Sequence, residues 1–370
     1  MRTARSRPTG QELRFGGPRR GLRGRTVGVG AGVRRALHIP RRERAHPQCE
    51  GGRPAGRPER AESLGMPRIE LPDPLRRRPF ALGDPSAELL SKGRLLGPDL
   101  ARPTRSVRSA VPLTSTVQRA WAFALAMPED VAFCHETAAR LWDLPLPSPD
   151  APDRPLHVIR DNRHNRIRRT GVVGHRGLES RSIARCRGLP VVGQADTWLD
   201  LAEVLGADDL VVIGDCIATR AQSVVPLVEA LRRRRRMPKG SRDRAVRSLQ
   251  WVRVGAASAM ESRARLVVVG AGLPEPELNA TIHDALGEWV ATGDLVWRKQ
   301  RVVGEYQGEQ AHHGPRARRV DSDRRAVLEE ELGWTVVEIF KDDVFNPGRR
   351  HRLVTRVARH LGIDPSELTL

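Results

Sequence analysis

The sequence is poor in cysteine and tyrosine, and it has no long apolar run. Its four cysteines, Cys49, Cys134, Cys186 and Cys216, are too few and too scattered for a disulfide scaffold or a CxxC zinc site. This usage indicates a reducing, cytoplasmic setting. No apolar run approaches the ~18–20 residues of a membrane span, so we expect no membrane association. With one tyrosine and 4% aromatic residues, no base-stacking platform for single strands is indicated.

Lysine is also scarce, although the chain is strongly basic. Its 370 residues carry a net charge of +20, and only four of the 64 basic residues are lysine. The remaining sixty arginines, together with abundant Ala, Gly and Pro, are typical of a GC-rich coding bias as much as of a binding surface. The charge therefore favours a nucleic-acid partner only modestly.

The first 65 residues contain sixteen arginines and five glutamates, a net charge of +11, with many glycines and prolines. Such a segment buries too little apolar surface to offset its chain entropy, so it is predicted to be disordered. It has no apolar region of ~7–15 residues and is not a secretory signal. Two explanations stay open: Met66 is the true start and the upstream part is a misplaced leader, or the segment is a basic arm for nucleic acid.

The middle of the chain is predicted to hold two modules and a linker. Residues 66–115 suggest a small helical unit with a short ribbon, and residues 116–236 an α+β lobe. The run Arg232–Arg236 indicates an exposed helix end or a linker, with a phosphate-binding patch as the alternative. A linker is expected over residues 237–255.

Three histidines of this region, His135, His157 and His175, show no HxH or HxxxH spacing. That spacing would be needed for a metal site within one strand or one helix. They are therefore interpreted as surface histidines or as internally hydrogen-bonded ones.

From residue 256 the pattern becomes more regular. It predicts a helix from Ser258, three strands, a helix, the strand 335–340 and a last helix over 349–361. This order indicates a mixed α/β domain with a central sheet flanked by helices.

Two carboxylates fall inside the predicted strands. Asp294 stands beside Leu295 and Val296, and Glu305 lies within an apolar run, where an unpaired carboxylate is costly to bury. Neighbouring strands would bring the two acids together, with Gln307 on the same face as Glu305. Such an oxygen-rich group suits Mg²⁺ or Mn²⁺, which could polarise a phosphodiester and activate water. The simpler alternative is a strand-end cap for Asp294 and an ion pair of Glu305 with Arg298 or Arg301.

The order Glu261, Asp294, Glu305-x-Gln307 resembles the PD-(D/E)XK nuclease superfamily with its restriction-endonuclease-like fold. More closely, residues 258–362 resemble a bacterial domain family related to very-short-patch-repair endonucleases. The motifs that carry this resemblance are Met260-Glu261-Ser262, Leu273-Pro274-Glu275-Pro276, Gly293-Asp294-Leu295-Val296-Trp297, Glu305-Tyr306-Gln307-Gly308 followed by histidine, and Leu332-Gly333-Trp334-Thr335-Val336-Val337.

The resemblance implies that Asp294 and Glu305 bind the metal ion, and that Glu261 supports the site through water or as an acid–base group. Gln307 stands where most of the superfamily has lysine, which removes a cation that would stabilise the transition state. The residues that could replace that lysine are Lys299 and Arg324. A general acid or base is expected from His312 or His313, with Asp321 or Asp323 as weaker candidates.

The front half, residues 74–220, resembles the AbiEi-family antitoxins, which have an N-terminal winged helix and a larger C-terminal lobe. The resemblance implies a short winged-helix-like module over residues 66–115 and an antitoxin-like α+β lobe over residues 116–236. The motifs are Arg78-Pro79-Phe80, the stretch Phe133–Pro145 and Pro155-Leu156-His157-Val158. Two functions therefore stay open. One is a Mg²⁺- or Mn²⁺-dependent DNA endonuclease with an accessory DNA- or partner-binding front half and no small-molecule cofactor. The other is an antitoxin-type DNA-binding regulator whose nuclease-like domain is inactive.

Overall fold

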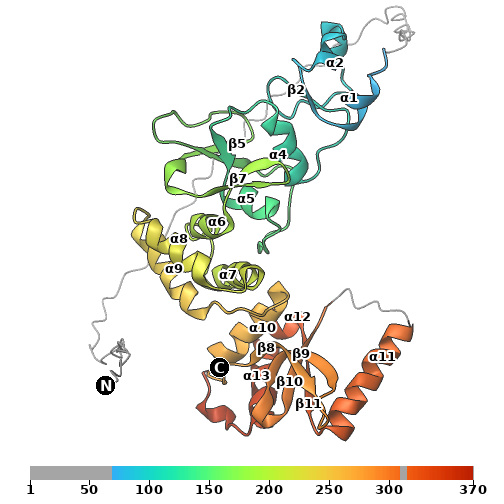
Figure 1. Ribbon diagram of the computed structural model, residues 1–370, viewed down its shortest axis with the longest axis vertical. Helices are drawn as coiled ribbons and strands as arrows, with labels where there is room; N and C mark the ends of the chain where they lie inside the picture. The colour runs from blue at the N-terminus through green and yellow to red at the C-terminus, as the bar shows by residue number, and fades with distance from the viewer. Residues whose placement is uncertain (1–68, 309–314, 370) are drawn as a thin grey trace, which may run out of the picture. The chain divides into compact units, whose positions relative to one another are not determined.

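The computed structural model describes residues 69–308 and 315–369 (Figure 1). Residues 1–65, which the sequence predicts to be disordered and for which two explanations stay open, lie outside the described residues. The candidate histidines His312 and His313 lie outside them as well. Within the described ranges, no single helix has the length and apolarity to cross a membrane. One bent helix pair, Ala207–Ala221 with Val225–Arg233, meets the test only when its two helices are counted together.

The described chain begins with three short helices and a ribbon, as the sequence predicts. The elements are α1 Asp73–Arg77, β1 Phe80–Ala81, α2 Pro85–Glu88, α3 Lys92–Leu95 and β2 Val107–Arg108. Strand β1 pairs with β2 in antiparallel fashion, and Leu75, Phe80 and Leu100 form a small apolar core beneath them. Each short helix depends on this packing, because isolated helices of fewer than ~12–15 residues are marginal in water.

A five-stranded mixed sheet follows, in the order β5-β4-β3-β7-β6. Its elements are α4 Thr116–Ala124, β3 Val131–Phe133, α5 His135–Leu141, β4 Leu156–Arg160, β5 Val172–Arg176, η1 Leu178–Ser180, β6 Ile183–Cys186 and β7 Leu189–Val192. Buried residues of α4 and α5 pack against β3, β4 and β7. The two helices thus cover the apolar residues of the central strands.

Four helices continue the lobe and share a second apolar core. They are α6 Gln194–Leu201, α7 Ala207–Ala221, α8 Val225–Arg233 and α9 Lys239–Trp251. Trp198 lies at the centre of this core, and its indole N–H donates to the Leu210 carbonyl at 2.7 Å. The stretch predicted as a linker, 237–255, contains α9, which packs against α7. The apolar residues of α9 are few, which explains why the sequence pattern suggested a linker.

The arginine run is not simply a solvated helix end. Arg234 has only 3% of its side chain exposed and lies between Asp196 and Asp200, which are both fully buried. Its Nη2 donates to Asp196 Oδ1 at 2.9 Å, and Nη1 donates to Asp200. Neighbouring Arg235 and Arg236 are exposed. One arginine of this run is therefore buried and pairs with two aspartates. The sequence alone does not show which of the five identical residues it is.

Two of the three histidines of this lobe, His157 and His175, are internally hydrogen-bonded, as one of the two sequence interpretations expects, whereas Nδ1 of the buried His135 makes no hydrogen bond. His135, His157 and His175 come from separate parts of the chain, yet the ring of His175 stacks on both others, with centroids 3.9 Å from that of His135 and 5.2 Å from that of His157. The rings of His135 and His157 are tilted relative to each other. Spacing along the chain could not reveal this, because the sheet pairing brings them together.

The C-terminal domain has a four-stranded mixed sheet in the order β11-β10-β9-β8. Its elements are α10 Ala259–Gly270, β8 Glu277–His283, β9 Trp289–Trp297, η2 Arg298–Gln300, β10 Val302–Gln307, α11 Pro315–Ala326, the π-helix η3 Val327–Glu331, β11 Thr335–Phe340, α12 Lys341–Phe345, α13 Pro347–Leu361 and η4 Pro365–Glu367. Strands β8, β9 and β10 are antiparallel neighbours, and β11 is parallel to β10. This confirms the predicted mixed α/β class.

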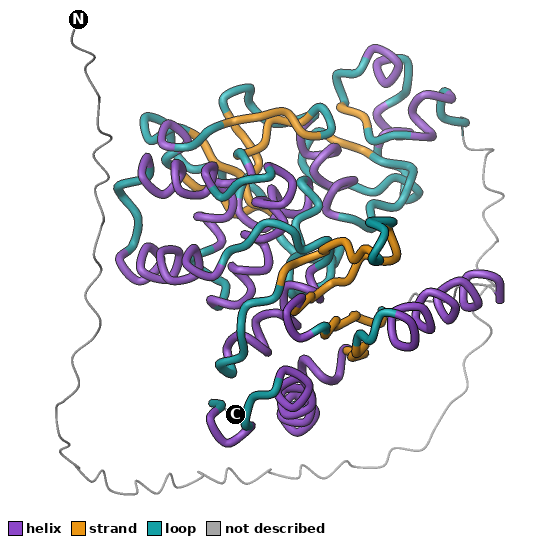
Figure 2. Tube along the Cα trace, turned by 60° about the horizontal axis from the view of Figure 1, so that its bottom comes forward, coloured by secondary structure: helices purple, strands orange, loops and turns teal. Residues whose placement is uncertain are grey.

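Helices lie on both sides of this sheet (Figures 1 and 2). On one face, α10, α12 and α13 pack on Leu295, Val337 and Ile339. On the other, Leu328 of η3 packs on Val303 and on other residues of that face. The central strands β9 and β10 are therefore covered on both faces over much of their length, and a carboxylate within that part is partly shielded from water.

The Arg234 ion pairs make a testable prediction. We expect Arg234→Ala to lower the free energy of unfolding by about 3–5 kcal/mol, because it leaves two buried aspartates without their shared cation. The neighbouring Arg235→Ala, at an exposed position, is the matched control and should change it by less than about 1 kcal/mol. Urea unfolding of both variants checks this. Equal effects of the two substitutions would contradict the assignment.

Candidate functional site

Asp294 lies where strands β9 and β10 separate. Their ladder runs from Val302 opposite Trp297 to Gly304 opposite Leu295. The next position in this register sets Glu305 opposite Asp294, and there the regular pairing ends. The Tyr306 backbone N–H donates instead to Asp294 Oδ2 at 2.7 Å. The carboxylate thus takes the place of a backbone carbonyl, and it stands beside Glu305 as the sequence predicts.

The electrostatic environment of Asp294 is unfavourable for a charged carboxylate. Burial, together with the nearby charges of Glu261 and Glu305, raises its pKa to about 6. The Tyr306 N–H and the Arg324 guanidinium act in the opposite direction and only partly compensate. Three acids from α10, β9 and β10 therefore interact with one another. Carboxylates arranged in this way repel each other unless a cation or a proton is bound between them.

Glu261 is held at this place by the first turn of α10. The Ser258 hydroxyl caps the helix by accepting from the Glu261 N–H at 3.2 Å. Glu261 Oε2 in turn accepts from the Ala257 N–H at 2.8 Å and from Asn279 Nδ2 at 2.6 Å. The side chain is almost fully buried. Its orientation is therefore fixed before any ligand binds.

Asn279 is a site residue that the sequence reasoning missed. It lies in the middle of β8, between the pairs Leu278–Leu295 and Ala280–Gly293, which sets it opposite Asp294 in the register. Its φ of +45° is left-handed, a region that asparagine tolerates better than most residues. Its amide donates to Glu261 and to the Gly255 carbonyl. Asparagine is rare within strands, and this was the available signal.

Glu305 is approached by a cation, but not by either of the expected ones. Arg324 Nη2 lies 3.4 Å from Glu305 Oε1. Arg298 instead pairs with Glu277 at 2.8 Å, and Arg301 donates to the Leu332 carbonyl. Of the two predicted replacements for the missing lysine, the exposed Lys299 has no described contact with the acids, whereas Arg324 reaches the site from α11.

The remaining predicted residues have different outcomes. Gln307 is the last residue of β10, two positions beyond Glu305, and is partly exposed. His312 and His313 lie outside the described residues. Asp321 lies in α11, and its side chain is not among those described. Asp323, also in α11, is exposed to solvent.

The chemistry of these donors fits a hard divalent cation. Glu261, Asp294 and Glu305 offer carboxylate oxygens without any sulfur or imidazole nearby among the described residues, a set that suits Mg²⁺ or Mn²⁺. The three are less tightly gathered than a closed metal cage. Among the side chains that the structure describes, a different group, Cys134, His135 and His175, has ligand atoms all within 4.8 Å of one another. The three carboxylates of the acidic site are therefore more widely spaced than the ligand atoms of that group.

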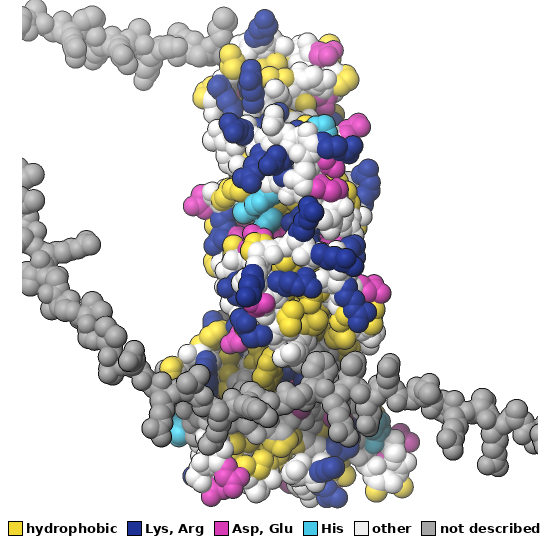
Figure 3. All heavy atoms as spheres, turned by 90° about the vertical axis from the view of Figure 1, so that its left-hand side faces the viewer, with side chains coloured by type: hydrophobic (Ala, Val, Ile, Leu, Met, Phe, Trp, Pro, Cys, Tyr) yellow, Lys and Arg dark blue, Asp and Glu magenta, His cyan; other side chains and the backbone are white. Residues whose placement is uncertain are grey.

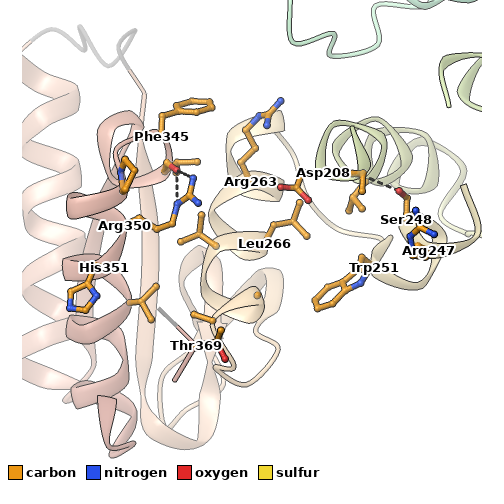
Figure 4. A pocket seen from close by; sticks show the side chains of 18 residues that line it. Asp208, Arg247, Ser248, Trp251, Arg263, Leu266, Phe345, Arg350, His351 and Thr369 are labelled. Atoms are coloured by element: carbon orange, nitrogen blue, oxygen red, sulfur yellow. Dashed lines mark hydrogen bonds between the residues drawn. The ribbon is translucent and has the colours of Figure 1, made fainter. Parts of the chain in front are cut away.

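A cavity of about 680 Å³ lies elsewhere, among α7, α9, α10, α12 and α13. Figure 4 shows Trp251, Leu266 and Phe345 in its wall. Two of its three arginines already have partners: Arg350 donates to the Val344 carbonyl, and Arg263 pairs with Asp209 at 2.5 Å. Asp208 is the one carboxylate among its lining residues, so this cavity has no acidic cluster comparable to that around Asp294.

Comparison with known proteins gives a partial match. The chain is 48% identical over 107 residues to the uncharacterized proteins MT2308 and Rv2248 of Mycobacterium tuberculosis, from strains CDC 1551 and H37Rv. The match covers 29% of this chain and 38% of each relative, so the chain spans less than half the length of these relatives. No family model matches, and no solved structure matches.

The raised pKa of Asp294 predicts a pH-dependent stability. A folded-state pKa of about 6, above the usual 3.8, means that the folded protein favours the proton. This contribution is complete below pH ~4 and is lost as the pH rises through 6. We expect Asp294→Asn to raise the free energy of unfolding by about 1–2 kcal/mol at pH 7.5 without divalent ions, and to give a much smaller gain near pH 4.

Urea unfolding at the two pH values measures this difference. The control is Asp323→Asn, since that carboxylate lies in solvent and its removal should have little effect at either pH. A stabilisation by Asp294→Asn that is the same at both pH values would show that burial of charge at Asp294 is not its cause.

Proposed function

We propose that the C-terminal domain is a metal-dependent DNA endonuclease of the PD-(D/E)XK type with a restriction-endonuclease-like fold. The observation that carries the proposal is the half-buried carboxylate of Asp294, whose pKa is raised to about 6 beside two further acids. The free-energy cost of burying the charged Asp294 carboxylate beside like charges is offset when a divalent cation binds. A structural role alone would need no second and third acid at the same place.

The arrangement of the strands supports this proposal. Asp294 and Glu305 come from adjacent strands, and Glu261 comes from the helix before the sheet, in the order that the nuclease resemblance implies. In the proposed enzyme, Asp294 and Glu305 bind Mg²⁺ or Mn²⁺, with Glu261 bound through water. The ion, when bound, polarises the scissile phosphate and lowers the pKa of a bound water.

The other groups of the site have roles of their own. Asn279 fixes Glu261 through its amide, and the Tyr306 N–H fixes Asp294, so both oxygen donors are oriented before substrate arrives. Arg324, at 3.4 Å from Glu305, is the side chain that supplies a positive charge in place of the missing lysine. The positive charge of Arg324 would stabilise the negative charge that develops in the pentacoordinate transition state of the phosphate.

In the proposed enzyme, basic side chains contact the phosphates of the DNA substrate. On the face drawn in Figure 3, lysine and arginine side chains are spread widely and are interspersed with acidic and apolar ones. Contacts between such basic side chains and phosphates bind DNA without reading its sequence, and they weaken as the salt concentration rises. The front half, with its resemblance to AbiEi-family antitoxins, is the proposed source of additional contacts with DNA or a partner.

A plasmid-nicking assay tests the proposal. The full chain should convert supercoiled plasmid to the open circular form with Mg²⁺ or Mn²⁺ and not with EDTA. Asp294→Ala and Glu305→Ala should each reduce the rate by about 100-fold or more, because each removes a metal ligand. The control is Glu277→Gln, which removes an exposed carboxylate of the same sheet that pairs with Arg298, and it should leave the rate unchanged.

Equal nicking by Asp294→Ala and the unchanged protein would contradict the endonuclease assignment. The alternative, an antitoxin-type regulator with an inactive nuclease-like domain, draws on two observations: Gln307 at the usual lysine position and the Arg324 contact that neutralises Glu305. It predicts a gel shift on DNA, for example the chain's own upstream region, with no cleavage in the presence of either ion.

A further inference from the structure

A second cluster of metal-binding side chains lies in the five-stranded sheet, in a core separate from that of the acidic site. Cys134 and His135 directly follow β3, His157 lies in β4 and His175 lies in β5. These strands are neighbours, and the Cys134 N–H donates to the His157 carbonyl at 3.1 Å. In the parallel pair β4–β5, His175 stands opposite Ile159, two residues beyond His157. The topology therefore gathers one thiol and three imidazoles from three strands.

The ligand atoms are close enough for a single ion. One sulfur or nitrogen atom from each of Cys134, His135 and His175 lies within 4.8 Å of the others. In a tetrahedral zinc site with Zn–S of ~2.3 Å and Zn–N of ~2.0–2.1 Å, ligand atoms are separated by roughly 3.3–3.8 Å. Small side-chain movements would thus bring the three atoms to coordination distance.

One buried group in the cluster lacks a partner. His135 is only 6% exposed, and its Nδ1 makes no hydrogen bond. The nearest carboxylate, Asp200, lies 3.8 Å away and is already bound by Arg181 and Arg234. A buried nitrogen without a partner costs about 1–3 kcal/mol. Its ring stacks on that of His175, so the unpartnered group belongs to the cluster itself.

Burial sets the protonation states of these side chains in the absence of an ion. Burial lowers the pKa of His135 to about 4 and that of His175 to about 3, so both imidazoles are neutral at pH 7. Neutral imidazole is the form that binds metal. Burial raises the pKa of the Cys134 thiol well above its usual value, and Asp200 raises it further, while Arg181 and Arg234 oppose this rise. Metal binding must therefore displace a proton from Cys134.

His157 has a supporting position. Its Nδ1 lies 3.1 Å from His175 Nε2, so the two rings can share one proton. A metal-bound histidine usually donates its second ring N–H to such a partner, which fixes the ring and its tautomer. If His175 Nε2 is the donor, His175 Nδ1 is left to bind the ion. Burial lowers the pKa of His157, and the charge of Glu136 opposes this shift.

We propose that Cys134, His135 and His175 bind one transition-metal ion of the Zn²⁺ class, with His157 as the residue that orients His175. The soft thiolate and the imidazoles distinguish this site from the carboxylate site, which suits Mg²⁺. The bound ion connects β5 to the end of β3 through side chains, across the intervening β4. The fourth position is open to water or a small anion.

Cobalt substitution tests the proposal. The full chain, stripped of metal with a chelator and then kept in excess Mg²⁺ to fill the carboxylate site, should bind one equivalent of Co²⁺ with the visible bands of a tetrahedral ion and a near-ultraviolet thiolate-to-cobalt band. Zn²⁺ should displace it, and excess Mg²⁺ should not. Cys134→Ser should abolish the thiolate band, whereas the matched control Cys186→Ser and the acidic-site variant Asp294→Ala should keep it. Absence of stoichiometric binding, or a thiolate band that persists in Cys134→Ser, would overturn the assignment.

Two further measurements do not depend on the folding of Cys134→Ser. His157→Ala should keep the thiolate band and weaken Co²⁺ binding by about 10–100-fold. X-ray absorption of the zinc-loaded chain should give one sulfur at ~2.3 Å and two nitrogens at ~2.0–2.1 Å. A coordination shell of oxygen only would overturn the proposal, as would a loss of the thiolate band in His157→Ala.

Discussion

A charge kept half-buried at the end of a strand ladder is the constraint on which the C-terminal domain depends. Asp294 accepts the Tyr306 N–H that would otherwise continue the pairing, so its carboxylate cannot turn out to solvent without leaving a backbone donor unpaired. The neighbouring strands adapt to it: β8 contributes Asn279 in a left-handed conformation, and β10 contributes Glu305. The left-handed residue of β8 and the end of the β9–β10 ladder therefore both lie next to one side chain, as is common at functional sites.

Much of this domain could be predicted from its sequence because its signals are local. Apolar alternation located β10 and β11, the Ser258 cap located α10, and two carboxylates within apolar runs located the acidic pair. Asn279 and the approach of Arg324 to Glu305 could not be derived in the same way. Both depend on the register of β8 and on the packing of α11, which are set by contacts between distant segments.

The middle lobe shows the same limit more clearly. Helix α9 has few apolar residues, and so its sequence did not differ from that of a linker. Arg234 is one of five identical neighbours, and only the positions of Asp196 and Asp200 select it for burial. His135, His157 and His175 are far apart in the chain, and a pairing of three strands unites them. Spacing rules detect metal ligands only within one element.

One buried contact gives the C-terminal domain a dependence on the helices before it. Arg265 of α10 is fully buried, and its Nη2 lies 3.0 Å from the equally buried Asp215 of α7. The same helix carries Glu261. A fragment that began after α7 would keep the pair of Arg265 with Glu275 but would lose Asp215, the fully buried one of its two counter-charges. The domain that carries the acidic site and the helical lobe are therefore expected to unfold as a single cooperative block.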